Sequence, residues 1–228
     1  FDTEHGGIAS GSNKFPPSLA SDLLLREYHD SGELRYLSVV EKTLERMGNG
    51  GIYDHLGGGI ARYSTDRKWL VPHFEKMLYD QALVASTYLD ALQATNNSQL
   101  GAFFDEKARG ILEYVLHNLT DAEGAFYSSE DADSENLEGK FYIWTRQEIL
   151  DVLGNQDGKI VANHFGVSEV GNWLHPGDAH VPSGPKNILH VARSAETIAK
   201  LESLDVTEVK NTITEAKRKL CKERGKRV

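Results

Sequence analysis

Residues that could carry chemistry are concentrated between Gly50 and Gln81, in the segment GGIYDHLGGGIARYSTDRKWLVPHFEKMLYDQ. Glycine permits positive φ and a close approach of the backbone to other groups, and a triple glycine, Gly57 to Gly59, lies in this segment. Carboxylates, imidazoles, a guanidinium and aromatic rings beside such a turn are what a site for a small polar ligand needs. The segment therefore predicts such a site, with the candidate residues Asp54, His55, Arg62, Tyr63, Trp69, His73, Glu75, Tyr79 and Asp80.

His73 and Glu75 are candidates for acid–base catalysis. A helix is expected over about 72–94, because Pro72 suits a first helical turn, and it would place both residues at the helix N-terminus. Imidazole titrates near neutrality, and a carboxylate can orient it or act itself. The alternative is capping, since the positive end of the helix dipole favours a glutamate there for structural reasons alone.

Asp54 and His55 adjoin the triple glycine. Asp54 could accept sugar hydroxyls, and His55 could donate or shuttle a proton. The structural alternative is turn chemistry, because aspartate side chains bond to their own backbone in turns.

Arg62 could clamp a carboxylate, or it could form an ion pair with Asp66 that holds a hairpin. Tyr63 and Trp69 could stack on a sugar ring, or they could cover the apolar face of that hairpin.

A second group of carboxylates follows between Glu130 and Glu138. Asp131 and Asp133 fall on the same side of an extended segment, so both could face one site. Glycosidase chemistry needs two carboxyl groups flanking the bond, and Glu75 could supply the second one. An EF-hand is rejected, because Asn136 and Tyr142 occupy the positions that require glycine and glutamate.

Composition excludes several function classes. A net charge of −9 argues against non-specific nucleic-acid binding, and no apolar run reaches the length of a membrane span. The single cysteine, Cys221, excludes an internal disulfide and fits a reducing, cytoplasmic setting. Zinc-ligand spacing, a phosphate-binding loop and a nucleophile elbow are all missing from the sequence. No metal or cofactor is predicted.

Apolar spacing predicts an all-α fold with short β-hairpins in the long links, at about 51–69 and 125–144. Thr145 and Glu148 predict a capping box, and Gly154 predicts the end of that helix. Strands are expected at 125–128 and 140–145, flanking the acidic loop. The other helices are expected at about 18–30 (ending at Gly32), 33–47 (with Gly48 as its stop), 72–94, 99–119 and after Asp205, where the apolar stripe is Val209, Ile213, Ala216 and Leu220.

Short and long links alternate along these helices. Short links make neighbouring helices antiparallel, so every long link should emerge at one end of the helix array. On that basis we expect His55, Arg62, His73, Glu75, Asp131 and Asp133 to converge at one end.

The strings GGIYDHLGGGIARYSTDRKWLVPHFEKMLYDQA and SSEDADSENLEGKFYIWT, with GGIASGSNKFPPS near the start, resemble the spermatogenesis-associated protein 20 family. That family is described as having a thioredoxin-like domain followed by a domain similar to six-hairpin glycosidases and N-acylglucosamine 2-epimerases. The resemblance covers most of residues 1–192 and implies part of an (α/α)6 toroid over residues 1–228. It also implies that the thioredoxin-like domain and the remainder of the toroid lie outside this chain.

Two function classes follow. The first is an enzyme acting on a sugar or polyol, either epimerase-like through His55 and His73 or hydrolase-like through Glu75 and Asp131. The second is a non-catalytic ligand-binding or scaffolding module that accompanies the thioredoxin-like domain. An incomplete toroid should leave an apolar edge exposed, and the last helix is expected to dock on it or to mediate self-association.

Overall fold

The computed structural model describes residues 1–8, 11, 13–173 and 180–227. Within these ranges the protein is mostly helical, with a few short antiparallel hairpins, as the sequence predicted. Its internal contacts divide the chain into two compact units, residues 1–132 and 133–228. The sequence analysis treated the chain as one partial domain and did not anticipate this division.

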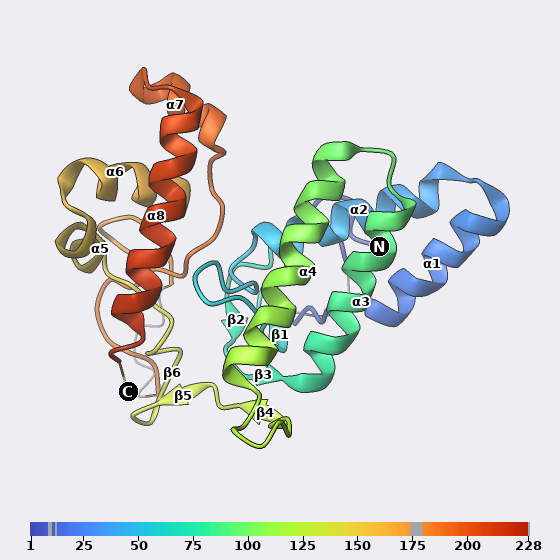
Figure 1. Cartoon of the computed structure of the whole chain (residues 1–228), viewed down its shortest axis with the longest axis horizontal. Helices are drawn as coiled ribbons and strands as arrows, with labels where there is room; N and C mark the ends of the chain where they lie inside the picture. The colour runs from blue at the N-terminus through green and yellow to red at the C-terminus, as the bar shows by residue number, and fades with distance from the viewer. Residues whose placement is uncertain (9–10, 12, 174–179, 228) are drawn as a thin grey trace. The chain divides into compact units, whose positions relative to one another are not determined.

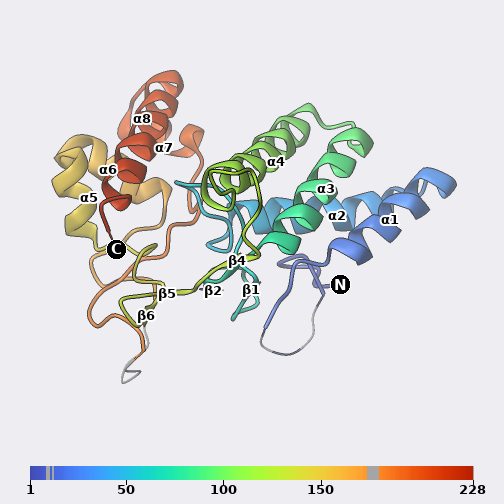
Figure 2. The same ribbon diagram turned by 60° about the horizontal axis from the view of Figure 1, so that its bottom comes forward.

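The first unit contains two packed helix pairs, α1 with α2 and α3 with α4 (Figure 1). Figure 2 again shows α3 and α4 side by side. Their bounds, close to the predicted ones except at the start of α3, are α1 Ser18–Ser31, α2 Leu34–Asn49, α3 Leu78–Ala94 and α4 Ser98–Asn118.

The two glycine stops predicted in the first unit have different outcomes. Gly32 ends α1, as predicted, and has the left-handed conformation typical of such a position. Gly48 was predicted to end the next helix, but α2 continues to Asn49. A Cβ on Gly48 would lie 2.6 Å from the Phe103 ring and 2.8 Å from the Tyr88 hydroxyl. Gly48 is therefore needed for helix packing rather than for termination.

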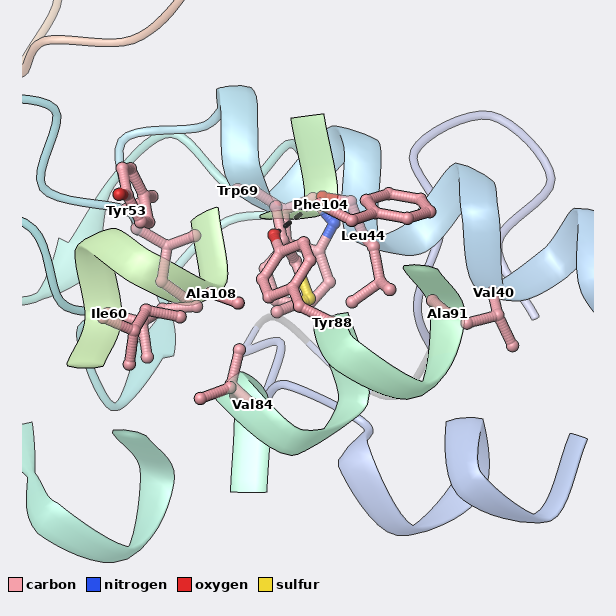
Figure 3. Close-up of a cluster of buried hydrophobic side chains, with 14 of the residues drawn as sticks. Val40, Leu44, Tyr53, Ile60, Trp69, Val84, Tyr88, Ala91, Phe104 and Ala108 are labelled. Carbon is pink, nitrogen blue, oxygen red and sulfur yellow. Dashed lines mark hydrogen bonds between the residues drawn. The ribbon is translucent and has the colours of Figure 1, made fainter. Parts of the chain in front are cut away.

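A hydrophobic core joins these helices to the long link between α2 and α3. Val40 and Leu44 of α2 pack with Tyr88 of α3 and Phe104 of α4 (Figure 3). Trp69, from the link, lies in the same cluster and is fully buried. The link is thus anchored on the core, which fixes the residues that precede and follow Trp69.

The segment before α3 is extended, and this corrects the helix predicted from Pro72. Burial alternates along it: Pro72, Phe74 and Lys76 are buried, whereas His73 and Glu75 are half-buried. That period of two is the pattern of a strand. Because the charged residue Lys76 occupies one of the buried positions, the alternation of buried and half-buried residues could not be recognised from the sequence.

Four short strands of the first unit form two antiparallel pairs. The pairing places Tyr63 opposite His73, and Lys76 opposite Glu130. The hairpin predicted at 51–69 is present in part, because Tyr53 bridges Ile60 but the partner of Tyr63 lies beyond Trp69. The strands are β1 Tyr63–Ser64, β2 Pro72–His73, β3 Lys76–Met77 and β4 Ser129–Glu130.

The second unit packs α8 against three shorter helices, of which the sequence analysis identified only the first. Thr145 and Glu148 form the predicted capping box at the start of α5, and Gly154 follows its last residue. The helices are α5 Arg146–Leu153, α6 Asn155–His164, α7 Ala195–Glu202 and α8 Val206–Arg224.

The strands predicted at 125–128 and 140–145 do not pair with each other. The hairpin instead lies inside the acidic loop, where β5, Asp133–Ser134, pairs with β6, Leu137–Glu138. Glu135 and Asn136 between them both have positive φ, which suits a tight two-residue turn. Trp144 bridges Asn187 rather than residues 125–128.

The apolar stripe of α8 is buried. Val209, Ile213, Ala216 and Leu220 all lie in the interior of the second unit, where α8 contacts α5, α6 and α7. This stripe, which was expected to dock on an open toroid edge or to mediate self-association, is therefore covered by helices of its own unit. None of the helices in the described part of the chain has both the length and the apolar character that a membrane span requires.

Candidate functional site

The β1–β2 pair and the extended segment after it place several polar side chains on one face of the first unit. His73 and Glu75 alternate with the buried residues of this segment, so both point to the same side. The ring of His73 stacks on Tyr63, with centroids 5.0 Å apart, and Tyr63 packs on the exposed ring of Phe15 at 4.8 Å. The result is a row of three rings that ends beside Glu75.

Arg62 and Glu75 are the charged pair of this face. Arg62 Nη1 donates to Glu75 Oε2 at 2.8 Å, and the two backbones are joined by a bond from Arg62 N to Glu75 O of the same length. His73 Nε2 lies 3.8 Å from the same Glu75 oxygen. The hydrogen bond to Glu75 and the electrostatic interaction with the Tyr79 hydroxyl raise the pKa of Arg62. Arg62 thus pairs with Glu75 rather than with Asp66.

Asp80 is a carboxyl group in a different environment. It is the third residue of α3, and its Oδ2 is buried without a hydrogen-bond partner among the described residues. Burial raises the pKa of Asp80 to about 6, the negative charge of Glu75 adds to the rise, and the positive charge of Arg62 opposes it. A carboxyl group of this kind is partly protonated near neutral pH and can donate a proton.

Replacing Asp80 should change how stability depends on pH. Its folded pKa is raised, so the protonated form favours folding below the ordinary pKa of 3.8, and that contribution is lost as pH rises through about 6. Asparagine cannot ionise. We expect Asp80→Asn to be more stable than the parent at about pH 8, by about 1 kcal/mol after allowing for solvent screening, and nearly equal at about pH 4.

Urea unfolding at the two pH values measures this difference. Asp90→Asn is the matched control, because Asp90 is an exposed carboxylate on the same helix. An Asp80→Asn effect that is the same at both pH values would contradict the assignment.

The structure brings together six of the predicted site residues, all in the first unit. Asp131, also in the first unit, directly follows Glu130, the residue that pairs with Lys76. Asp131 is exposed. The six residues are Arg62, Tyr63, His73, Glu75, Tyr79 and Asp80.

Three other predicted residues make contacts that stabilise the fold. His55 is 4% exposed, and its Nε2 donates to the carbonyl oxygen of Gly50 at 2.8 Å. Trp69 is fully buried, and its indole N–H donates to the carbonyl oxygen of His5. Asp54 Oδ1 accepts two backbone N–H groups of its own turn, from residues 56 and 57, as the turn-chemistry alternative predicted. Asp133 lies on β5 in the second unit. The convergence that was expected for His55, Arg62, His73, Glu75, Asp131 and Asp133 is therefore not found within the first unit.

The sequence analysis missed the residues that support this face. Lys76 Nζ is buried and donates to Asp54 Oδ2 and to the carbonyl oxygen of Gly58, both at 3.0 Å. It also lies 4.1 Å from the ring centre of Tyr114, whose hydroxyl donates to Glu130 Oε2. The only local sequence signal for a buried Lys76 was the alternating pattern of residues 72–77. Among the described residues, no group of three histidine, cysteine or acidic side chains is placed to hold a metal ion.

Comparison with known proteins finds relatives that match the whole chain. No protein-family model matches it. The chain is similar over its whole length to spermatogenesis-associated protein 20 of Homo sapiens (37% identical) and of Rattus norvegicus (36%). It is 33% identical to the uncharacterized protein B0495.5 of Caenorhabditis elegans, again over its whole length. The resemblance predicted from the sequence is thereby confirmed. The chain spans only 31%, 30% and 33% of the lengths of these three relatives.

Proposed function

We propose that the first unit carries an acid–base site for a sugar or polyol, in which Asp80 donates a proton and Glu75 is the partner carboxylate. The observation that carries this proposal is the contrast between the two carboxyl groups. Burial raises the pKa of Asp80 to about 6, whereas Glu75 accepts a charged hydrogen bond from Arg62. Two carboxyl groups in such different environments are suited to separate roles as acid and as base or nucleophile.

The side chains around these carboxyl groups suit a polyhydroxylated ligand. Phe15 and Tyr63 offer ring surface for stacking on a sugar, and Tyr79 is half-exposed with its hydroxyl near Arg62. The resemblance to a family with a glycosidase- and epimerase-like domain supports the same ligand class. The names of the relatives mention no ligand or reaction.

Carboxylate chemistry is favoured over the two-histidine mechanism. Epimerisation through His55 and His73 would need both rings at the ligand, but His55 is buried and bonded to a backbone carbonyl. Asp131, which follows the strand residue paired with Lys76, provides a further carboxylate for a hydrolase-like reaction. We therefore favour hydrolysis of a glycosidic bond as the reaction class.

We further propose that the helix pairs α1–α2 and α3–α4 are part of an (α/α)6 toroid. In the relatives, which are longer than this chain, the other helix pairs of the toroid would lie in the part of their sequence that the chain does not match. The single cysteine favours a cytoplasmic setting for the protein.

A non-catalytic ligand-binding module is the second candidate. The ion pair of Arg62 with Glu75 favours it, because each charge is already neutralised by the other. In that case the row of rings would hold the sugar, and the protonation of Asp80 would not matter.

Asp80→Asn separates the two candidates. Intact protein is screened with chromogenic aryl glycosides for hydrolysis and with free aldoses for proton exchange at C2. We expect Asp80→Asn to lower turnover at least about 100-fold, as for loss of a general acid, and to leave ligand binding within about threefold. Glu75→Gln should also lower turnover, whereas the exposed-carboxylate control Asp90→Asn should not.

Ligand binding without turnover, unchanged by Asp80→Asn but weakened by Tyr63→Ala, would identify the binding module instead. No binding and no turnover across the whole panel would reject the sugar or polyol class.

A further inference from the structure

The second unit contains a cavity of about 350 Å³, near the lower end of the range for small-molecule sites. Residues of this unit line it: Glu135, Lys140, Phe141, Ile143, Glu148, Pro182, Lys186 and Arg227. None of these residues belongs to the acid–base site of the first unit, so the cavity calls for a separate explanation.

Positive charge exceeds negative charge around this cavity. Three cations and two carboxylates line it. Lys140 is paired with Glu135, and Arg227 Nη2 lies 3.6 Å from Glu148 Oε1. The ammonium group of Lys186 has no hydrogen bond or ion pair with any residue in the described part of the chain. Among the described lining residues, one positive charge is therefore left for a ligand.

The cationic wall is held in place by the fold. Arg227 Nη1 donates to the carbonyl oxygens of Phe141 and Ile143, at 2.9 and 2.7 Å, and its guanidinium lies 3.9 Å from the ring centre of Trp144. The backbone oxygen of Lys186 accepts hydrogen bonds from the N–H groups of residues 172 and 173. Arg227, whose guanidinium is held in this way, loses little conformational freedom when it binds an anion.

The remaining lining is apolar. Phe141, Ile143 and Pro182 give the cavity a surface against which the hydrocarbon part of a ligand can pack. A single surplus charge matches a singly charged anion better than a doubly charged phosphate. We infer that this cavity binds a small organic monocarboxylate, with Lys186 as the main partner of the carboxylate group.

Methyl NMR of the protein tests this inference directly. The probes are acetate, pyruvate, benzoate and inorganic phosphate, each titrated to about 10 mM. We expect at least one monocarboxylate to shift the δ-methyl resonance of Ile143 saturably and to leave Ile160, in the core of the second unit, unmoved. Phosphate should bind more weakly than the best monocarboxylate.

Lys186→Met keeps most of the side-chain length and removes the charge. It should weaken monocarboxylate binding at least about tenfold. Lys200→Met is the matched control, because Lys200 is exposed on α7 of the same unit, and it should bind as the parent does. Asp80→Asn should also leave this binding unchanged, so the outcome is independent of the proposed acid–base site.

Three results would overturn the inference: no saturable shift at Ile143 with any monocarboxylate, tighter binding of phosphate, or unaltered binding by Lys186→Met. If Lys186→Met does not fold, Lys186→Gln takes its place, and the titration of the parent protein still decides between binding and no binding.

Discussion

Gly58→Ala is expected to destabilise the protein by about 3 kcal/mol or more. Gly58 has φ +76°, a conformation that costs alanine about 1–2 kcal/mol. A Cβ there would also lie 2.1 Å from the carbonyl oxygen of Gly110 on α4. Backbone atoms cannot move aside as a flexible side chain can, so the loop or the helix would have to shift. Overpacking of this kind adds about 1–3 kcal/mol.

Gly124→Ala is the control that isolates the backbone term. Gly124 has φ +88°, and a Cβ there would meet nothing within 4 Å. It should therefore show only the conformational cost of about 1–2 kcal/mol. The free energy of unfolding in urea measures both variants. Equal losses for Gly58→Ala and Gly124→Ala would mean that the loop does not approach α4 as closely as described.

The same contact gives the triple glycine a role in packing. The sequence analysis associated Gly57 to Gly59 with a ligand, because glycines also permit close approach to small molecules. In the structure, Gly58 approaches Gly110, and a Cβ on Gly59 would lie 2.6 Å from the ring of Tyr114. Nothing near the glycines in sequence indicates which helix they face, since α4 begins only at Ser98, after α3.

Local signals, by contrast, were sufficient for most helices. The capping box of Thr145 with Glu148 and the left-handed Gly32 depend only on neighbours within a few residues, and both were predicted correctly. The stripe of α8 was also correct as a buried face, but its partners were not, because α6 and α7 were not identified. Periodicity shows that a face is buried, not what covers it.

The candidate site could likewise be predicted from the sequence only in part. Residue type and proximity in sequence were enough to select Arg62, His73, Glu75 and Asp80. The features that make their environments different depend on tertiary structure. The side-chain bond from Arg62 to Glu75 joins residues that flank the paired strands β1 and β2, and the raised pKa of Asp80 follows from burial. His55 could not be separated from them by sequence, because a buried histidine and a catalytic one look alike there.

Lys76→Met should destabilise the first unit by about 3–5 kcal/mol, the usual cost of removing one partner of a buried ion pair. The side chains of Lys76 and Asp54 are only 3% and 5% exposed, and their charged atoms are 3.0 Å apart. Methionine fills a similar volume but leaves the Asp54 carboxylate without its cation. Lys68→Met, which removes an exposed lysine of the same link, should change the free energy of unfolding by no more than about 0.5 kcal/mol.

A double-mutant cycle with Asp54→Asn distinguishes lost charge pairing from lost packing. Neutralising Asp54 removes the unpaired carboxylate, so the double variant should recover about 1–3 kcal/mol relative to the sum of the single changes. Strict additivity would mean that the ion pair is not formed. The pair matters beyond stability, because Lys76 ties the glycine loop to the strand that follows Glu75 and faces Glu130. If the acid–base proposal holds, Lys76→Met measured well below its unfolding temperature should also lower turnover, since Glu75 and Asp131 depend on this strand for their alignment.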